Sequence, residues 1–123
     1  MHELSVAISI VQSVIDAAAD QPGRVSAVNV RVGAMSGVIP EALSFAWQPA
    51  SQGTALEGTS LNIEPVPAAV HCPTCDREVE LPGQRLVCPL CQQRTPQLVR
   101  GRELDILSLE IHDEPPAPHP AHP

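Results

Sequence analysis

Two C-x2-C motifs constrain this 123-residue chain more than any other feature: Cys72 with Cys75, and Cys88 with Cys91, with twelve residues between the motifs. Each motif can present two thiolates from one tight turn, and two such turns brought together form a tetrahedral site of four sulfurs. That geometry and those soft ligands favour zinc. The spacing is slightly shorter than is usual for this pattern, and it predicts a short zinc ribbon built on one hairpin.

The predicted zinc site is structural or regulatory rather than catalytic. Four cysteines close the coordination shell, so neither water nor substrate can reach the metal for Lewis-acid chemistry. Other interpretations of the cysteines remain: a pair of redox dithiols, structural disulfides, or iron in a rubredoxin-like site. In a reducing compartment, four cysteines are more often metal ligands than disulfides.

The charge balance argues against two classes of partner. Fourteen acidic residues stand against seven arginines and no lysine, so the formal net charge is −7, and zinc with four thiolates would take it from −7 to −9. Such a field repels phosphate backbones and anionic lipid headgroups. The two aromatic residues, Phe45 and Trp47, are too few to stack bases. We therefore expect neither nucleic acid nor membrane as a partner, and a monomer or weak homodimer.

The apolar stretch that follows the N-terminus is expected to be a helix and not a targeting segment. Glu3 stands where a signal peptide carries positive charge, and Asp16 interrupts the apolar run. No run reaches the ~18 uncharged residues of a membrane span, so a cytoplasmic protein is expected. Apolar residues recur instead at helical spacing up to a stop near Pro22, and they predict an amphipathic helix: Leu4, Ala7, Ile8, Val11, Val14, Ile15 and Ala18.

Alternating apolar residues predict three strands, over 26–32, 60–64 and 103–111. A second helix is expected to begin at Pro40, because proline suits the first helical position, and to end near Pro49. The expected fold class is α+β, a small three-stranded sheet with two helices and an inserted zinc ribbon.

The cysteine segment lies between the second and third predicted strands. The predicted domains are an α+β domain over 1–67 and 98–111, a zinc-ribbon subdomain over 68–97, and a disordered tail over 112–123 rich in proline and histidine.

The first three residues form a second candidate metal site. His2 places an imidazole next to the terminal amine of Met1, and deprotonated backbone nitrogens between them can complete a planar donor set. Planar nitrogen donors suit Ni(II) or Cu(II) rather than Zn(II). Glu3 could add a carboxylate nearby, or simply favour the helix N-terminus electrostatically. Taken alone, the pattern favours an ordinary helix start over a metal site.

Several unrelated motifs, in order from Met1 to about Ile111, resemble those of the HypA/HybF family of hydrogenase maturation factors. They are Met1 to Ser5, Val32 to Val38, Pro40 to Leu43, Glu57 to Thr59 followed by the strand from Leu61 to Glu64, the two cysteine motifs, and Gly101 to Leu104.

The resemblance implies a nickel metallochaperone rather than an enzyme. It implies that the protein acts together with the GTPase HypB to insert nickel into the nickel-iron hydrogenase large subunit or its maturation complex. In some organisms the family also serves urease. It assigns Ni(II) to His2, with the amine of Met1 and the backbone of Glu3 in support. It assigns Zn(II) to Cys72, Cys75, Cys88 and Cys91. The family fold, an α+β nickel domain with an inserted zinc ribbon, agrees with the layout predicted above.

The sequence departs from the family pattern after the cysteine motifs and at its end. Asp76 and the pair Gln92-Gln93 stand where glycine or a glycine-histidine pair is frequent, so only His71 could take the role of a histidine beside the ribbon. More often such a histidine is a solvated neighbour. The tail contains three histidines: His112, His119 and His122. Histidine-rich tracts can bind nickel, but we expect these three to be inert.

Two rival functions use the same cysteines. A zinc-ribbon nucleic-acid or transcription module predicts salt-dependent binding to DNA or RNA, against which the acidic balance argues. A small redox enzyme would need a reactive thiol and activity without zinc.

Overall fold

The computed structural model describes residues 2–95 and 97–112, which form two helices and two separate three-stranded sheets. The first sheet, of order β2-β1-β6, is accompanied by both helices, and the second, of order β4-β3-β5, contains the cysteine motifs. The elements in chain order are α1 (Glu3–Ala18), β1 (Arg24–Gly33), α2 (Pro40–Ser51), β2 (Ser60–Val66), β3 (Ala69–Cys72), β4 (Arg77–Glu80), β5 (Leu98–Arg100) and β6 (Leu104–His112).

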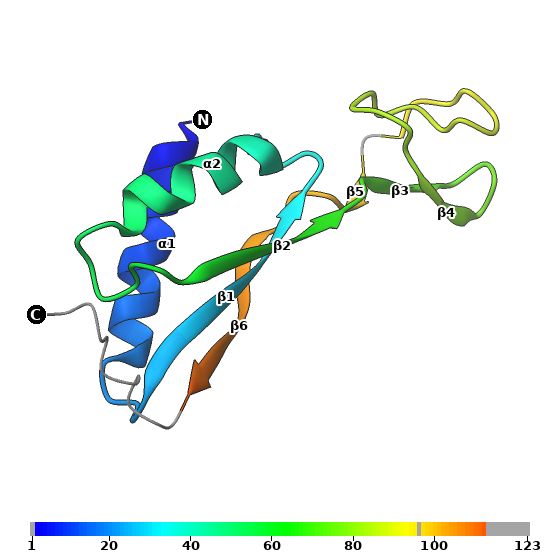
Figure 1. Ribbon diagram of the computed structural model, residues 1–123. Helices are drawn as coiled ribbons and strands as arrows, with labels where there is room; N and C mark the ends of the chain where they lie inside the picture. The colour runs from blue at the N-terminus through cyan, green and yellow to red at the C-terminus, as the bar shows by residue number, and fades with distance from the viewer. Residues whose placement is uncertain (1, 96, 113–123) are drawn as a thin grey trace, which may run out of the picture.

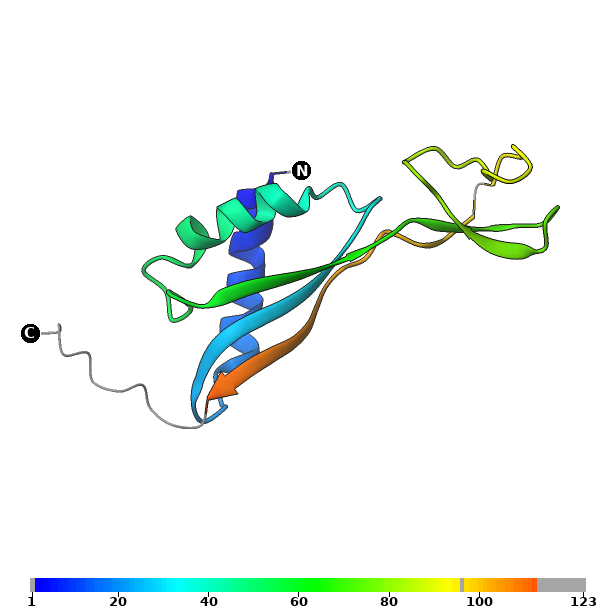
Figure 2. The same ribbon diagram turned by 45° about the vertical axis from the view of Figure 1, so that its right-hand side comes forward.

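Both helices cover the same face of the first sheet (Figures 1 and 2). Helix α1 buries Ala7, Ile10, Val11 and Val14, whose spacing of three and four residues places them on one side of the helix. These side chains meet the inward-facing valines of β1 and the buried residues of α2, so that one continuous apolar core fills the space between the layers. The α+β architecture predicted from the sequence, with a ribbon inserted before the last strand, is confirmed.

Strand β1 is the centre of this sheet, parallel to β2 and antiparallel to β6. The face turned away from the helices is polar. There Asn29 Oδ1 accepts a hydrogen bond from Asn62 Nδ2 at 2.8 Å, and Asn29 Nδ2 donates to Ser108 Oγ at 3.0 Å. Arg31 forms an ion pair with Asp105 at 2.9 Å. The alternation of apolar and polar residues along β1 therefore places the apolar side chains on the buried face of the sheet and the polar ones on the hydrated face.

Helix α2 extends past the residue at which it was expected to end. Pro49 lies inside the helix, which continues to Ser51. Proline cannot donate the helical hydrogen bond at its own position. However, Gln52 N–H donates to Gln48 O at 3.0 Å, and buried Trp47 and Ala50 hold the last turn against the core.

The second sheet projects from the end of the first sheet at which β1 finishes, the same end at which α1 begins (Figure 1). Among the described residues, its own buried apolar cluster consists of Ala68, Val70 and Leu81, and Met35 from the loop after β1 packs against it together with Leu86 and Leu98. The segment between β5 and β6 is held to the end of β1 by backbone hydrogen bonds in which Gly33 N–H donates to Glu103 O at 2.7 Å and Met35 N–H donates to Gly101 O at 2.6 Å.

Strand β5 pairs with β3 in the second sheet, although residues 98–100 were predicted to belong to the α+β domain. His112, predicted to open the tail, is the last residue of β6. The remaining predicted tail, 113–123, lies outside the described residues. Neither α1 nor α2 has the length and hydrophobicity that a membrane-spanning helix requires.

Candidate metal sites

The four cysteines of the two motifs lie together at the far side of the second sheet. Their sulfur atoms are all within 4.8 Å of one another. Cys72 Sγ is 3.5 Å from Cys91 Sγ, and Cys75 Sγ is 3.9 Å from Cys88 Sγ. In a tetrahedral site with Zn–S bonds near 2.3 Å, neighbouring sulfurs are about 3.8 Å apart. The cluster therefore has the size and donor set that suit a tetrahedral metal ion such as zinc.

Each cysteine motif forms a tight turn that aims its sulfurs at this cluster. In the first turn, Cys75 N–H donates to Cys72 Sγ at 3.4 Å. In the second, Gln92 N–H donates to Cys88 O at 2.8 Å. The residues just after the motifs, Asp76 and Gln92, have φ values of 53° and 67°. This left-handed conformation is the one that glycine adopts without cost, which explains why glycine would suit both positions.

The sulfur cluster does not hold four thiolates by itself at neutral pH. A sulfur–sulfur hydrogen bond with Cys91, together with burial, raises the pKa of Cys75 to about 12. Burial acts to raise the pKa of Cys88, but hydrogen bonds from the backbone N–H groups of Cys91 and Leu90, together with those from the sulfurs of Cys91 and Cys72, lower it to about 7. A metal ion that binds all four sulfurs must therefore displace protons from the cluster.

His71 lies in β3 directly before Cys72, and it is half-buried opposite Glu78 of β4. The same carboxylate forms an ion pair with Arg100 of β5 at 2.6 Å, so Glu78 connects the two strands that flank His71. Among the residues that the structure describes, only the four cysteines gather three or more potential metal ligands at bonding distance, and His71 is not in that group.

The second candidate site lies at the start of α1. His2 is exposed, occupies the N-cap position, and makes no capping hydrogen bond with its side chain. The first hydrogen bond of the helix runs from Val6 N–H to His2 O at 3.1 Å. The backbone N–H groups of the preceding turn are therefore not used inside the helix. Met1 lies outside the described residues.

The carboxylate of Glu3 has a partner that sequence reasoning missed. Ile39, the residue before α2, donates its backbone N–H to Glu3 Oε2 at 3.2 Å. This hydrogen bond lowers the pKa of Glu3. The carboxylate thereby links the start of α1 to the start of α2. No local pattern predicts the contact, because the two residues are 36 positions apart.

Fold and sites together define a small metal-binding protein in which an α+β domain carries a four-cysteine ribbon. The model of a family described as "Hydrogenase/urease nickel incorporation, metallochaperone, hypA" matches residues 1–111. The chain belongs to this HypA family, which consists of metallochaperones and not of enzymes.

Curated relatives and solved structures agree with the family match. A hydrogenase maturation factor HypA from Chloroflexus aurantiacus is 48% identical over 112 residues, covering 89% of this chain and 98% of the relative. Another from Roseiflexus is 45% identical over 118 residues, covering 94% and 96%. The solution structure of the nickel metallochaperone HypA from Helicobacter pylori superposes with a TM-score of 0.61 at 23% identity, covering 93% of this chain and all of that one. This last similarity establishes the fold.

Proposed function

We propose that this chain carries Ni(II) at its N-terminus for the maturation of nickel-iron hydrogenase. The observation that carries the proposal is the exposed His2 at the cap of α1, beside backbone N–H groups that the helix leaves unused. An imidazole, a terminal amine and intervening backbone nitrogens form a planar set of the kind Ni(II) prefers. Because the donors lie at the end of the chain, a receiving site can take the ion by ligand exchange.

Glu3 supports this nickel site through its backbone and not through its carboxylate. The carboxylate accepts the hydrogen bond from Ile39 N–H, which holds the first turn of α1 in place. His2 is thereby presented from a fixed helix start, while the Glu3 backbone nitrogen stays next to the imidazole.

Zn(II) is the proposed resident metal of the ribbon, held by Cys72, Cys75, Cys88 and Cys91. The sulfur separations of 3.5 and 3.9 Å support this assignment. Bound zinc would fix the two cysteine turns relative to each other and supply structure rather than reactivity. Four thiols kept for metal also fit work in the cytoplasm, where disulfides are rare.

The proposed partners follow from the family. A GTPase of the HypB type delivers nickel together with this chain, and the hydrogenase large subunit or its maturation complex receives it. The acidic balance of −7 favours protein partners over nucleic acid, and it disfavours strong self-association beyond a weak homodimer.

Nickel titration of untagged, zinc-loaded protein tests the terminal site. We expect an absorption band of planar Ni(II), and its loss in His2→Ala. His71→Ala is the matched control, because it removes the histidine beside the ribbon and should leave the band intact. Acetylation of the Met1 amine should also abolish the band, since an amide nitrogen in place of the amine is a poor donor. Unchanged nickel affinity in both His2→Ala and the acetylated chain would refute the terminal site.

A further inference from the structure

The outer edge of β6 is a strand edge without a partner among residues 2–95 and 97–112. In the sheet order β2-β1-β6, one side of β6 pairs with β1 and the other side faces outward. The strand is nine residues long. Such an edge presents unpaired N–H and C=O groups that can bind another extended chain. Proteins usually block a long edge with a helix, proline, lysine or a bulge. β6 contains no proline or lysine, and its register shift lies between Ile106 and Ser108, beyond the residues of β6 that line the groove described next.

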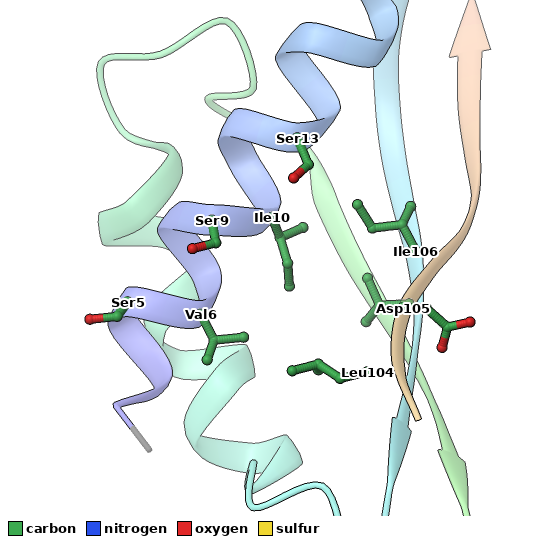
Figure 3. A pocket seen from close by; sticks show the side chains of 9 residues that line it. Ser5, Val6, Ser9, Ile10, Ser13, Leu104, Asp105 and Ile106 are labelled. Atoms are coloured by element: carbon green, nitrogen blue, oxygen red, sulfur yellow. The ribbon is translucent and has the colours of Figure 1, made fainter. Parts of the chain in front are cut away.

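A groove of about 380 Å³ runs along this edge, between β6 and α1. On the helix side it is lined by Val6, Ile10 and Ser13, and on the sheet side by Leu104 and Ile106. Figure 3 shows the apolar side chains of the two elements pointing toward one another across it. The small serine side chains on this part of α1 leave space that a larger residue would fill. Leu104 and Ile106 consequently remain 37% exposed each.

The two faces of β6 differ in chemistry. Asp105 points away from α1 in Figure 3, to the polar face of the sheet. Glu110 is on that face as well, where it accepts a hydrogen bond from Asn29 Nδ2 at 3.3 Å. Arg31 forms an ion pair with Asp105, which leaves Glu110 as the carboxylate of β6 without an ion-pair partner among the described residues. A strand added beside β6 would therefore meet apolar groups on its inner face and the carboxylate of Glu110 on its outer face.

From this arrangement we propose that β6 and the groove bind an extended segment of a partner protein in which apolar residues alternate with lysine or arginine. The segment extends the sheet by one strand, as in other cases of β-strand addition. Its apolar side chains enter the groove against Leu104 and Ile106, and its basic side chains lie near Glu110. Ser5 also lines the groove, three residues from His2, so the bound segment runs close to the start of α1. The proposal does not depend on nickel binding.

Charge distinguishes this occupant from two others. A second copy of this chain would bring a further net charge of −7, which opposes self-association. The chain's own sequence after His112 contains five prolines, which lack the N–H groups that a strand ladder needs. An alternating apolar and basic segment from another protein matches both faces.

A synthetic peptide tests the proposal on the full, zinc-loaded chain. The probe is a peptide of about eight residues, the length of a strand, with alternating valine and lysine. We expect it to bind, to slow amide hydrogen exchange in β6, and to bind more weakly as salt is added. The same residues arranged as a valine block and a lysine block should bind at least about tenfold more weakly. A copy N-methylated at alternate residues on the edge that faces β6 should not bind.

Two arginine substitutions provide the matched protein variants. Ser13→Arg places a long side chain in the groove from an exposed helical position, and it should weaken peptide binding at least about tenfold. Ser44→Arg makes the same change at an exposed position of α2 outside the groove, and it should leave binding within about twofold. Circular dichroism checks that both variants keep their helices.

Three results would overturn the proposal. The first is equal binding of the alternating and block peptides, which would reduce the contact to general electrostatic attraction. The second is equal binding by Ser13→Arg and Ser44→Arg. The third is self-association of the unliganded chain in sedimentation experiments that Ser13→Arg abolishes, which would make a second copy the occupant of the groove.

Discussion

At the scale of single residues, the carboxylate of Glu3 links the start of α1, the proposed nickel site, to the loop between β1 and α2. It accepts a hydrogen bond from Ile39 N–H and so fixes the first turn of α1 against the loop after β1. That same loop contributes Met35 to the apolar cluster of the ribbon. A side chain that the sequence suggested as a nickel ligand thus has a structural task.

The lowered pKa of Glu3 predicts a pH-dependent contribution to stability. Folding lowers this pKa from its ordinary value of 4.5 because Ile39 N–H favours the charged carboxylate. The contribution is therefore complete above the ordinary value and is lost as pH falls through the lower pKa of the folded state. Glu3→Gln should be less stable than wild type near pH 7, and the difference should shrink between about pH 5 and 3.

Urea unfolding followed by Trp47 fluorescence measures this difference, because Trp47 lies in the core of the α+β domain and not in the ribbon. Glu41→Gln in the first turn of α2 is the control, because it removes a nearby carboxylate and leaves the hydrogen bond from Ile39 N–H to Glu3 intact. A constant gap between wild type and Glu3→Gln at every pH would show that the Ile39 contact does not depend on the charge of Glu3.

Candidate site residues could be predicted where a short sequence motif identified them. The four cysteines followed from two short motifs, and the structure brings all four together. His2 is where the sequence placed it, exposed at the start of a helix. The contact between Glu3 and Ile39 was not predictable, because it depends on how two helices pack and not on any local pattern.

At the scale of elements, α2 contains a proline that its packing tolerates. Pro49 cannot donate a hydrogen bond to the helix, yet the helix continues because Trp47 and Ala50 are buried on either side of it. Trp47 is fixed further by a hydrogen bond from its Nε1 to Thr59 O at 3.1 Å. Tertiary contacts here outweigh the local preference that predicted an end near Pro49.

Replacing this proline should stabilise the protein. Pro49 is exposed, so Pro49→Ala restores a helical hydrogen bond without leaving a cavity. We expect the free energy of unfolding to rise by about 1–3 kcal/mol, measured by urea denaturation. Pro73→Ala, in the exposed first cysteine turn, is the comparison and should not show the same gain. A loss of stability in Pro49→Ala would indicate that the ring makes a needed contact.

Helices and strands whose apolar residues recur at a regular spacing were predicted well, and elements without such a spacing were not. In α1 and β1 the apolar residues recur at helical and strand spacing, and both elements lie near their predicted positions. β5 is only three residues long and carries no period, so its pairing with β3 could not be inferred. The register shifts between β1 and β6 could not be predicted from the sequence either, because a bulge depends on how a strand pairs with its neighbour.

At the scale of the whole molecule, the two sheets meet at a crowded backbone crossing. Gly33 ends β1 directly against the backbone of Gly101, and a side chain at Gly33 would overlap Gly101 O. Gly101 itself has a φ of 125° and approaches the backbone of Ala68. Both glycines are needed because three backbone segments come together where the ribbon joins the α+β domain.

This crossing predicts that Gly33→Ala is strongly destabilising. The added methyl group must push apart backbone atoms that have no flexible side chain to yield, at a cost of about 2 kcal/mol or more. Gly83→Ala is the matched control, since that position is open and its φ is ordinary. Urea unfolding of both variants gives the comparison, and equal stability would mean that the junction can open without loss.

The insertion of the ribbon also affects the conformational entropy that the chain loses when the first sheet, β2-β1-β6, forms. Asn29 of β1 and Ser108 of β6 hydrogen-bond across 79 positions of sequence, and the ribbon lies between them. Once β3 and β5 pair, Ala69 and Arg100 are neighbours, and the unpaired chain that separates β1 from β6 becomes much shorter. Closing a shorter loop costs less entropy and speeds a long-range pairing. A folded ribbon therefore reduces the entropy that the chain loses when β6 pairs with β1.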